Sequence, residues 1–252
     1  MKHFTQKLLL TSIILTTSSI ASASWLDKGM DFFKQTPASD SKGESKDGLL
    51  KSLTNGDIQA AFKEALSIGS EKVVGQLSKT DGFNSDPKIH ISLPGSLNTV
   101  KTTLDKFGMG GMTDDLELKL NRAAEAATPE AKALFLNAIK DMSFEDVQAI
   151  YKGPQDSATQ YLKSKTSEDL KAKMAPIIDR TLNEVGAVKA YDSVMSKYKG
   201  MPMVPDVKAN LLEHVTEQGM NGMFYYLAQQ EEAIRKDPVK QSTELLKKVF
   251  GK

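Results

Sequence analysis

The stretch Asp114–Ile150 reads DDLELKLNRAAEAATPEAKALFLNAIKDMSFEDVQAI, and it decides the fold of this chain. Its apolar residues recur at spacings of three and four, which places them on one face of a helix with about 3.6 residues per turn. Thr128 and Pro129 interrupt the pattern, because Thr caps helices and Pro suits their first position. Further on, Ser143 and Asp146 have the spacing of a capping box. We therefore predict three consecutive helices whose very short joints favour tight packing.

Three polar residues, Asn121, Arg122 and Glu125, lie in the alanine-rich first helix of this stretch, where partial burial is expected. Arg122 and Glu125 are one turn apart and can pair. Two interpretations are open. Either the three residues form a binding or catalytic site on a helix face, or the ion pair serves to fix helix packing. They are the candidate site residues of the chain.

The composition favours the same fold for the rest of the protein. The 252 residues are 40% hydrophobic and 26% charged, which suffices for one sizeable core or two small ones. Lys, Leu and Ala are frequent, whereas alternating Val, Ile and aromatic residues are scarce. We predict an all-α fold, a bundle-like single domain over residues 49–252 with at most one short extended segment or hairpin.

The same periodicity predicts further helices. In the helix expected at Ile58–Leu77, Gly69 and Gly75 are each expected to mark a close helix contact. Val207–Arg235 is the longest helical run. Shorter helices are expected at residues 159–162, 187–198 and 239–250.

Two helices carry specific expectations. In Leu97–Phe107, the aromatic Phe107 is expected to face inward with the other apolar residues. Pro176 falls within a helical pattern at residues 167–185 and should kink or break it. The glycines of Gly108–Met112 precede a helix but lack the Walker pattern, so we interpret them as a plain turn.

One segment, Lys88–Leu93, alternates apolar and polar residues as a strand does. It places Ile89, Ile91 and Leu93 on one side, and a Pro-Gly pair follows it. Since one strand cannot form a sheet, the segment either packs across helices in extended form or pairs with a strand that the sequence does not reveal.

The first 23 residues have the pattern of a secretory signal. Two lysines precede an apolar run at Leu8–Ile20, and an Ala-Ser-Ala cleavage pattern follows at residues 21–23. We expect cleavage between Ala23 and Ser24 and a periplasmic location. The apolar run is too short and too rich in Ser and Thr to span a membrane comfortably. The chain has no cysteine, so it is not expected to be a lipoprotein.

Residues 24–48 are expected to be an amphipathic N-terminus followed by a flexible linker. Four apolar side chains would share one side of a short helix there, namely Trp25, Leu26, Met30 and Phe33. They would either contact a membrane surface or partner, or belong to an N-terminus that docks on the helical domain or frays.

Several chemistries have no support in the sequence. Without cysteine there is no disulfide or thiolate chemistry. His90 and His214 are the histidines left after cleavage, and they do not form a metal-binding motif, so neither a metal nor a cofactor is expected. A Gly-x-Ser-x-Gly elbow is also absent. Loss of two leader lysines leaves 31 basic against 32 acidic residues, a net charge of about −1 that gives no attraction to nucleic acid.

Six segments together resemble the bacterial domain-of-unknown-function family 4197, and the resemblance extends from about Leu49 to the C-terminus. It implies a largely helical, exported protein of bacteria with two membranes, and it implies no activity and no catalytic residues. The segments are Lys79–Phe83, Ile89–Gly95, Leu120–Ala127, Met142–Ala149, Gly219–Phe224 and Leu245–Phe250.

Two functions from different classes follow. The first is a non-enzymatic periplasmic binding or interaction protein, whose partner is a protein or a small apolar ligand. It would use grooves between helices or the extended segment. The second is a hydrolase or lyase with a polar site around Asn121, Arg122 and Glu125. The oligomeric state is not indicated.

Overall fold

The computed structural model describes residues 55–196 and 207–236, with side chains of the last helix described from Leu211 onward. Over these ranges the chain forms helices and turns without a strand, so the predicted all-α single domain is confirmed. None of the helices in these ranges is long and apolar enough to cross a membrane. In chain order the elements are α3 (Asn55–Leu77), the 3-10 turn η1 (Gly95–Leu97), α4 (Asn98–Lys106), α5 (Gly111–Ala127), the 3-10 turn η2 (Thr128–Glu130), α6 (Ala131–Lys140), α7 (Phe144–Lys152), α8 (Ser157–Glu184), α9 (Ala187–Ser196) and α10 (Val207–Lys236).

Some predictions concern residues outside these ranges and stay predictions. They are the cleaved leader, the amphipathic N-terminus with its linker, the domain start near residue 49 and the last helix at residues 239–250.

The three consecutive helices predicted from Asp114–Ile150 are α5, α6 and α7. The capping box is present, since the Ser143 hydroxyl accepts from the Asp146 N–H and the Asp146 carboxylate accepts from the Ser143 N–H. The expected cap at Thr128 is wrong. Its hydroxyl donates instead to the carbonyl of Ala124, one turn back, and η2 joins α5 to α6.

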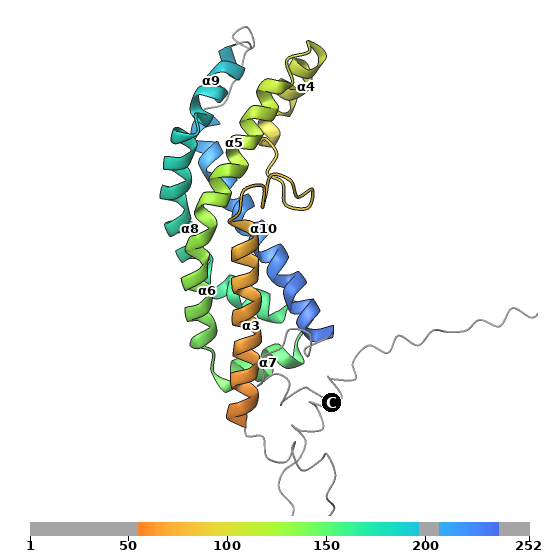
Figure 1. Cartoon of the computed structure of the whole chain (residues 1–252), viewed down its shortest axis with the longest axis vertical. Helices are drawn as coiled ribbons and strands as arrows, with labels where there is room; N and C mark the ends of the chain where they lie inside the picture. Colours follow the sequence, from red (N-terminus) through yellow and green to blue (C-terminus); the bar gives the residue numbers. More distant parts are fainter. Residues whose placement is uncertain (1–54, 197–206, 237–252) are drawn as a thin grey trace, which may run out of the picture. The chain divides into compact units, whose positions relative to one another are not determined.

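The core lies where α5, α8, α10 and α3 meet. α8 packs against both α10 and α5, α10 also packs against α3, and α3 packs against α6 (Figure 1). α5 contributes leucines and alanines to this core, and its alanines let neighbouring helices approach closely. The fully buried apolar residues of α5 are Leu116, Leu120, Ala123, Ala124 and Ala127.

Pro176 does not break its helix. α8 is continuous and joins the two helices predicted at residues 159–162 and 167–185. Met174 and Ile178, on either side of the proline, have no exposed surface. Burial of this apolar face against the core outweighs the backbone hydrogen bond that the proline removes.

Phe107 faces outward, contrary to the prediction, with 73% of its surface exposed. α4 ends at Lys106, and the chain then turns through Gly108 at a φ of +70°. Met109 and Met112 pack against the core after this turn. The helix therefore ends one residue too early to carry Phe107 onto the buried face.

Gly222 of α10 allows a close approach that a side chain would prevent. A Cβ atom on Gly222 would lie 2.7 Å from Cε1 of Phe83 and 3.2 Å from Cβ of Ile89. In α3, Gly69 lies at a contact with Ile234 as expected, but Gly75 has no neighbour that a Cβ would meet within 4 Å. The predicted close contact at Gly75 is therefore wrong.

These glycines give a matched pair of variants. We expect Gly222→Ala to lower the free energy of unfolding by about 1–3 kcal/mol, because the new methyl group overpacks the contact with Phe83. Gly75→Ala should raise it by up to about 1 kcal/mol, because alanine favours helix and no clash opposes it. Urea unfolding followed by circular dichroism measures both. Equal effects of the two substitutions would contradict the packing described here.

Candidate functional site

One face of α5 carries three buried polar side chains spaced four residues apart, Glu117, Asn121 and Glu125. This spacing aligns them along the helix. We call them the α5 polar stripe. They face the chain between α3 and α4, residues 78–94, which crosses the helices without regular secondary structure (Figure 1). Such a segment needs partners for its backbone groups when it is buried.

Asn121, at the centre of the stripe, has no exposed surface. Its Oδ1 accepts from the N–H of Ile91 at 2.9 Å, and its Nδ2 donates to the C=O of the same residue at 2.9 Å. Nδ2 also donates to the carbonyl of Glu117 in its own helix, at 2.8 Å. The side chain thus pairs with both backbone groups of Ile91, as a residue of a neighbouring β-strand would.

Glu117 holds the segment two residues further along. Its Oε1 accepts from the N–H of Leu93 at 3.1 Å and from Nζ of Lys101 at 2.8 Å, and Nε2 of His90 lies 3.6 Å from its Oε2. Burial by itself raises the pKa of this carboxyl, but the hydrogen bonds from Lys101 and from the Leu93 N–H outweigh burial and lower the pKa below its usual value. The side chain is therefore an anion at neutral pH and a strong acceptor.

Glu125 holds the start of the segment. Its Oε1 accepts from the N–H groups of Phe83 and Asn84, at 3.1 and 3.2 Å. Its Oε2 accepts from Nη1 of Arg122 at 2.7 Å, and Nη2 of Arg122 donates to Oδ1 of Asp81 at 2.7 Å. The hydrogen bond to Glu125 is the main reason why the pKa of Arg122 lies above its usual value. The guanidinium thus joins the helix to the first turn of the segment.

α10 holds the opposite side of the segment. The Ser92 carbonyl accepts from Nε2 of His214 at 2.8 Å, and the Tyr226 hydroxyl donates to the Asp86 carboxylate. The latter bond raises the pKa of Tyr226 to about 12. The apolar side chains that the segment places in the core are Phe83, Ile89, Ile91 and Leu93. Residues 87–89 lie in a turn, where the Asp86 carbonyl accepts from the N–H groups of Ile89 and His90, and residues 90–94 have no regular secondary structure. Lys88–Leu93 therefore packs across helices without a partner strand in the described residues, but its first residues form a turn instead of the predicted extended chain.

A second cluster of buried polar side chains, Glu231 and Arg235 of α10, caps the N-terminus of α8. The carboxylate of Glu231, on α10, accepts from the N–H groups of Ala158 and Thr159 at 2.9 and 2.8 Å and from the Thr159 hydroxyl at 2.9 Å. Arg235 pairs with Glu231 at 2.7 Å and donates to the Ile150 carbonyl at 2.9 Å. The first N–H groups of a helix have no partner within it, so a residue of another helix supplies the cap here.

The structure brings the three predicted site residues together on one side of α5. Arg122 and Glu125 form the predicted ion pair, while Asn121 bonds to the backbone of Ile91 instead of to either of them. Sequence reasoning missed Glu117, although its spacing of four residues from Asn121 was a usable signal. It also missed Glu231 and Arg235, because they lie in a helix whose sequence has only an ordinary amphipathic pattern.

Both histidines in the described residues, His90 and His214, bond to backbone carbonyls. Nδ1 of His90 lies 2.8 Å from the Asn84 carbonyl, and His214 binds Ser92. Within residues 55–196 and 207–236, no group of three or more His, Asp or Glu side chains is placed to hold a metal ion.

Residues 52–251 match the family described as "Protein of unknown function (DUF4197)". The chain belongs to this family. No curated protein and no solved structure matches the chain. The matched range includes every helix described here, together with the α5 polar stripe and the Glu231 cap. Both features therefore lie within the DUF4197 domain itself.

The central contact of the stripe can be tested by an isosteric substitution. We expect Asn121→Leu to lower the free energy of unfolding by about 2–5 kcal/mol, because it leaves the buried N–H and C=O of Ile91 unpaired. Asn183→Leu is the matched control on α8, since Asn183 is exposed and bonds only within its own helix. It should change stability by less than about 0.5 kcal/mol. Urea unfolding of both variants provides the comparison, and a similar small effect of the two would contradict the role given to Asn121.

Proposed function

We propose that this protein is exported to the periplasm and acts there without catalysis, binding a partner protein through the surface that segment 78–94 displays. The proposal rests on the hydrogen bonds that the α5 polar stripe makes to segment 78–94. Its side chains bond to the backbone of the segment and so fix an irregular stretch of chain on a rigid helical scaffold. Recognition surfaces in proteins are often built in this way.

The exposed side of the segment has features of a protein-binding surface. Ser85, Pro87 and Lys88 are exposed, and Tyr225 of α10, 39% exposed, packs edge-on against the ring of Tyr226. We call Ser85, Pro87, Lys88 and Tyr225 the loop face. Tyrosine is enriched in protein interfaces because its ring buries much area while losing little conformational freedom. Tyr226 is tied to Asp86, which connects the tyrosine pair to the segment.

The contacts favour this function over a hydrolase or lyase that uses Asn121, Arg122 and Glu125. Both terminal nitrogens of Arg122 donate to carboxylates, and both oxygens of Glu125 accept hydrogen bonds from the chain itself. A substrate would have to displace these bonds in order to meet either group. The ion pair therefore supports the second interpretation of the cluster, in which it fixes packing.

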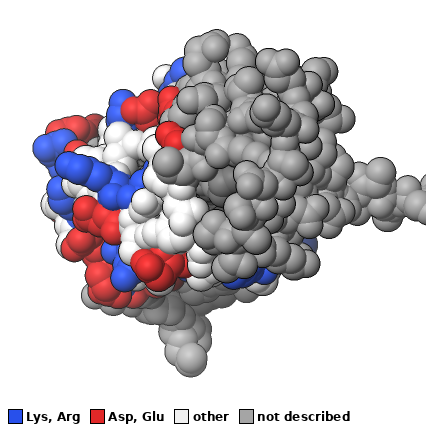
Figure 2. Space-filling view, turned by 90° about the horizontal axis from the view of Figure 1, so that it is seen from below, with Lys and Arg blue, Asp and Glu red and all other residues white. Residues whose placement is uncertain are grey.

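The cavity lined by residues of α3, α8 and α10 has a volume of about 10 Å³, which suits a water molecule and is far smaller than a ligand pocket. This cavity therefore gives no support to a small apolar ligand. Figure 2 shows Lys and Arg side chains interspersed with Asp and Glu on the face that it views. A mixed surface of this kind gives no general attraction to nucleic acid.

Membrane contact through Trp25, Leu26, Met30 and Phe33 remains a separate prediction.

Site-specific photo-crosslinking in intact cells tests the loop face. A photoreactive amino acid at position 88 or 225 should capture the same periplasmic protein in a discrete product. The matched control is position 173, since Lys173 is an exposed lysine of α8 and does not belong to the loop face. Identical products at all three positions, or none at positions 88 and 225, would contradict the proposal.

Substitution of the ion pair separates the two functions. We expect Arg122→Ala and Glu125→Ala each to lower the melting temperature, with crosslinking at the loop face weakened in proportion to the loss of folded protein. Unchanged melting temperatures together with a lost cellular phenotype would favour a catalytic site instead.

A further inference from the structure

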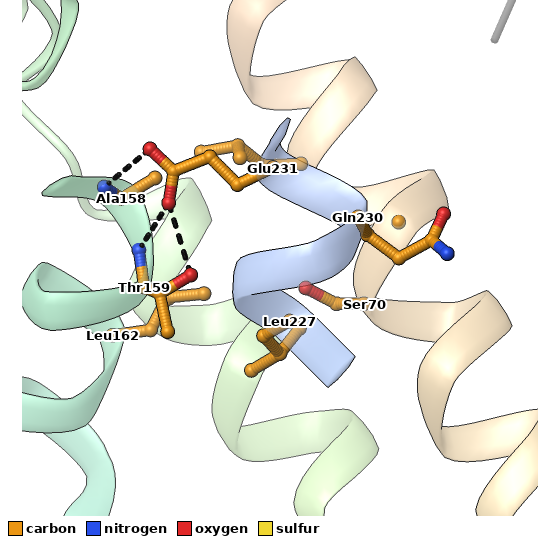
Figure 3. Close-up of a pocket in the computed structure, with 9 residues that line it drawn as sticks. Ser70, Ala158, Thr159, Leu162, Leu227, Gln230 and Glu231 are labelled. Atoms are coloured by element: carbon orange, nitrogen blue, oxygen red, sulfur yellow. Dashed lines mark hydrogen bonds between the residues drawn. The ribbon is translucent and has the colours of Figure 1, made fainter. Parts of the chain in front are cut away.

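Two buried polar atoms in the described helices receive no hydrogen bond from the protein, Oγ of Ser70 and Oε1 of Gln230. Both residues line the same cavity of about 10 Å³, between α3, α8 and α10 (Figure 3). Ser70 is only 2% exposed. Figure 3 shows the Gln230 amide directed away from Ser70, so the Ser70 hydroxyl is the unpartnered group that faces the cavity. Buried polar groups of native proteins nearly always have a partner, so this hydroxyl beside a cavity points to a missing bridging group.

The Ser70 hydroxyl differs from other hydroxyls on the same helices. Ser67 on α3 donates to the carbonyl of Lys63, and Thr166 on α8 donates to the carbonyl of Leu162, each four residues back. This local bond is the usual way in which a helical Ser or Thr satisfies its hydroxyl. The Ser70 hydroxyl does not make it, and Figure 3 shows this hydroxyl directed from α3 toward α10.

The opposite wall of the cavity is also polar. Thr159 lines it, and its hydroxyl donates to Glu231 at 2.9 Å, which leaves the oxygen lone pairs able to accept. The remaining wall is formed by apolar groups of Leu66, Ala158, Leu162 and Leu227. Ser70 can donate or accept, and Thr159 Oγ1 can accept.

We propose that this cavity binds one ordered water molecule, which bridges Ser70 of α3 to Thr159 of α8 and lies beside the Glu231 cap of α8. The volume is close to the smallest that holds a single water, and the hydroxyls of Ser70 and Thr159 supply the two polar partners that a buried water needs at least. The water links α3 to the start of α8, beside the cap. It is a structural component of the core and is separate from the loop face.

A crystal structure of the full chain at about 1.5 Å resolution tests the proposal directly. We expect a density peak in the cavity at about 2.7–3.2 Å from Ser70 Oγ and from a second polar atom of the lining. The same crystal form of Ser70→Val should lack the peak, because the added methyl groups occupy the space. A cavity without density in the unsubstituted protein, or a Ser70 hydroxyl bonded to the Leu66 carbonyl, would overturn the proposal.

Thermal unfolding provides an independent measurement. Ser70→Ala removes a partner of the water and should lower the melting temperature by about 2–4 °C more than Ser67→Ala, the matched control on the same helix. A dry cavity predicts the opposite order, because Ser70→Ala would then remove a hydroxyl that is buried without a partner. A Ser70→Ala variant as stable as the Ser67→Ala control, or more stable, would therefore also overturn the proposal.

Discussion

The Asn121 side chain bonds to both backbone groups of Ile91, and much of the core depends on this pair of hydrogen bonds. Segment 78–94 places four large apolar side chains between α5 and α10, yet it has no helix or sheet of its own to satisfy its backbone. Burying N–H and C=O groups without partners is costly. Asn121, with Glu117 and Glu125, supplies those partners from a neighbouring helix, and so an irregular segment is able to lie inside an all-α protein.

The same solution occurs at the start of α8, where Glu231 and Arg235 of α10 satisfy backbone groups of Ala158, Thr159 and Ile150. In both places a buried carboxylate lies beside a basic side chain and accepts hydrogen bonds from backbone N–H groups. Buried pairs of this kind contribute specificity of arrangement more reliably than net stability. Here they fix which part of the chain lies against which helix, and Gly222 of α10 lets segment 78–94 approach that helix closely.

The helices could be predicted from the sequence because the signal for each is local. Periodicity predicted α5, α6 and α7, and the Ser143 and Asp146 spacing predicted the start of α7. The alternation of Ile89, Ile91 and Leu93 placed these side chains on one side, and all three are buried. Two local expectations were not met. The break predicted as one outcome at Pro176 does not occur, because α8 continues through it with buried neighbours, and Phe107 is exposed because α4 ends just before it.

The candidate site was only partly predictable. Arg122 and Glu125 are three residues apart, so their pairing follows from helix geometry. Asn121 and Glu117 bond to the backbone of Ile91 and Leu93, which lie in an irregular segment. The spacing of residues in the sequence does not predict the path of such a segment. Glu117 therefore reads as one more charged residue on a helix, although it is buried. Side-chain bonds to a distant backbone have no periodic signature, and the structure is needed to find them.

Amide hydrogen exchange measured by NMR tests the central claim most directly. If Asn121 and Glu117 hold the segment, the N–H groups of Ile91 and Leu93 exchange as slowly as the buried amides of α5, while that of the exposed Ser92 between them exchanges much faster. Exchange at Ile91 and Leu93 as fast as at Ser92 would show that the segment is not held by α5, and it would contradict this account of the fold.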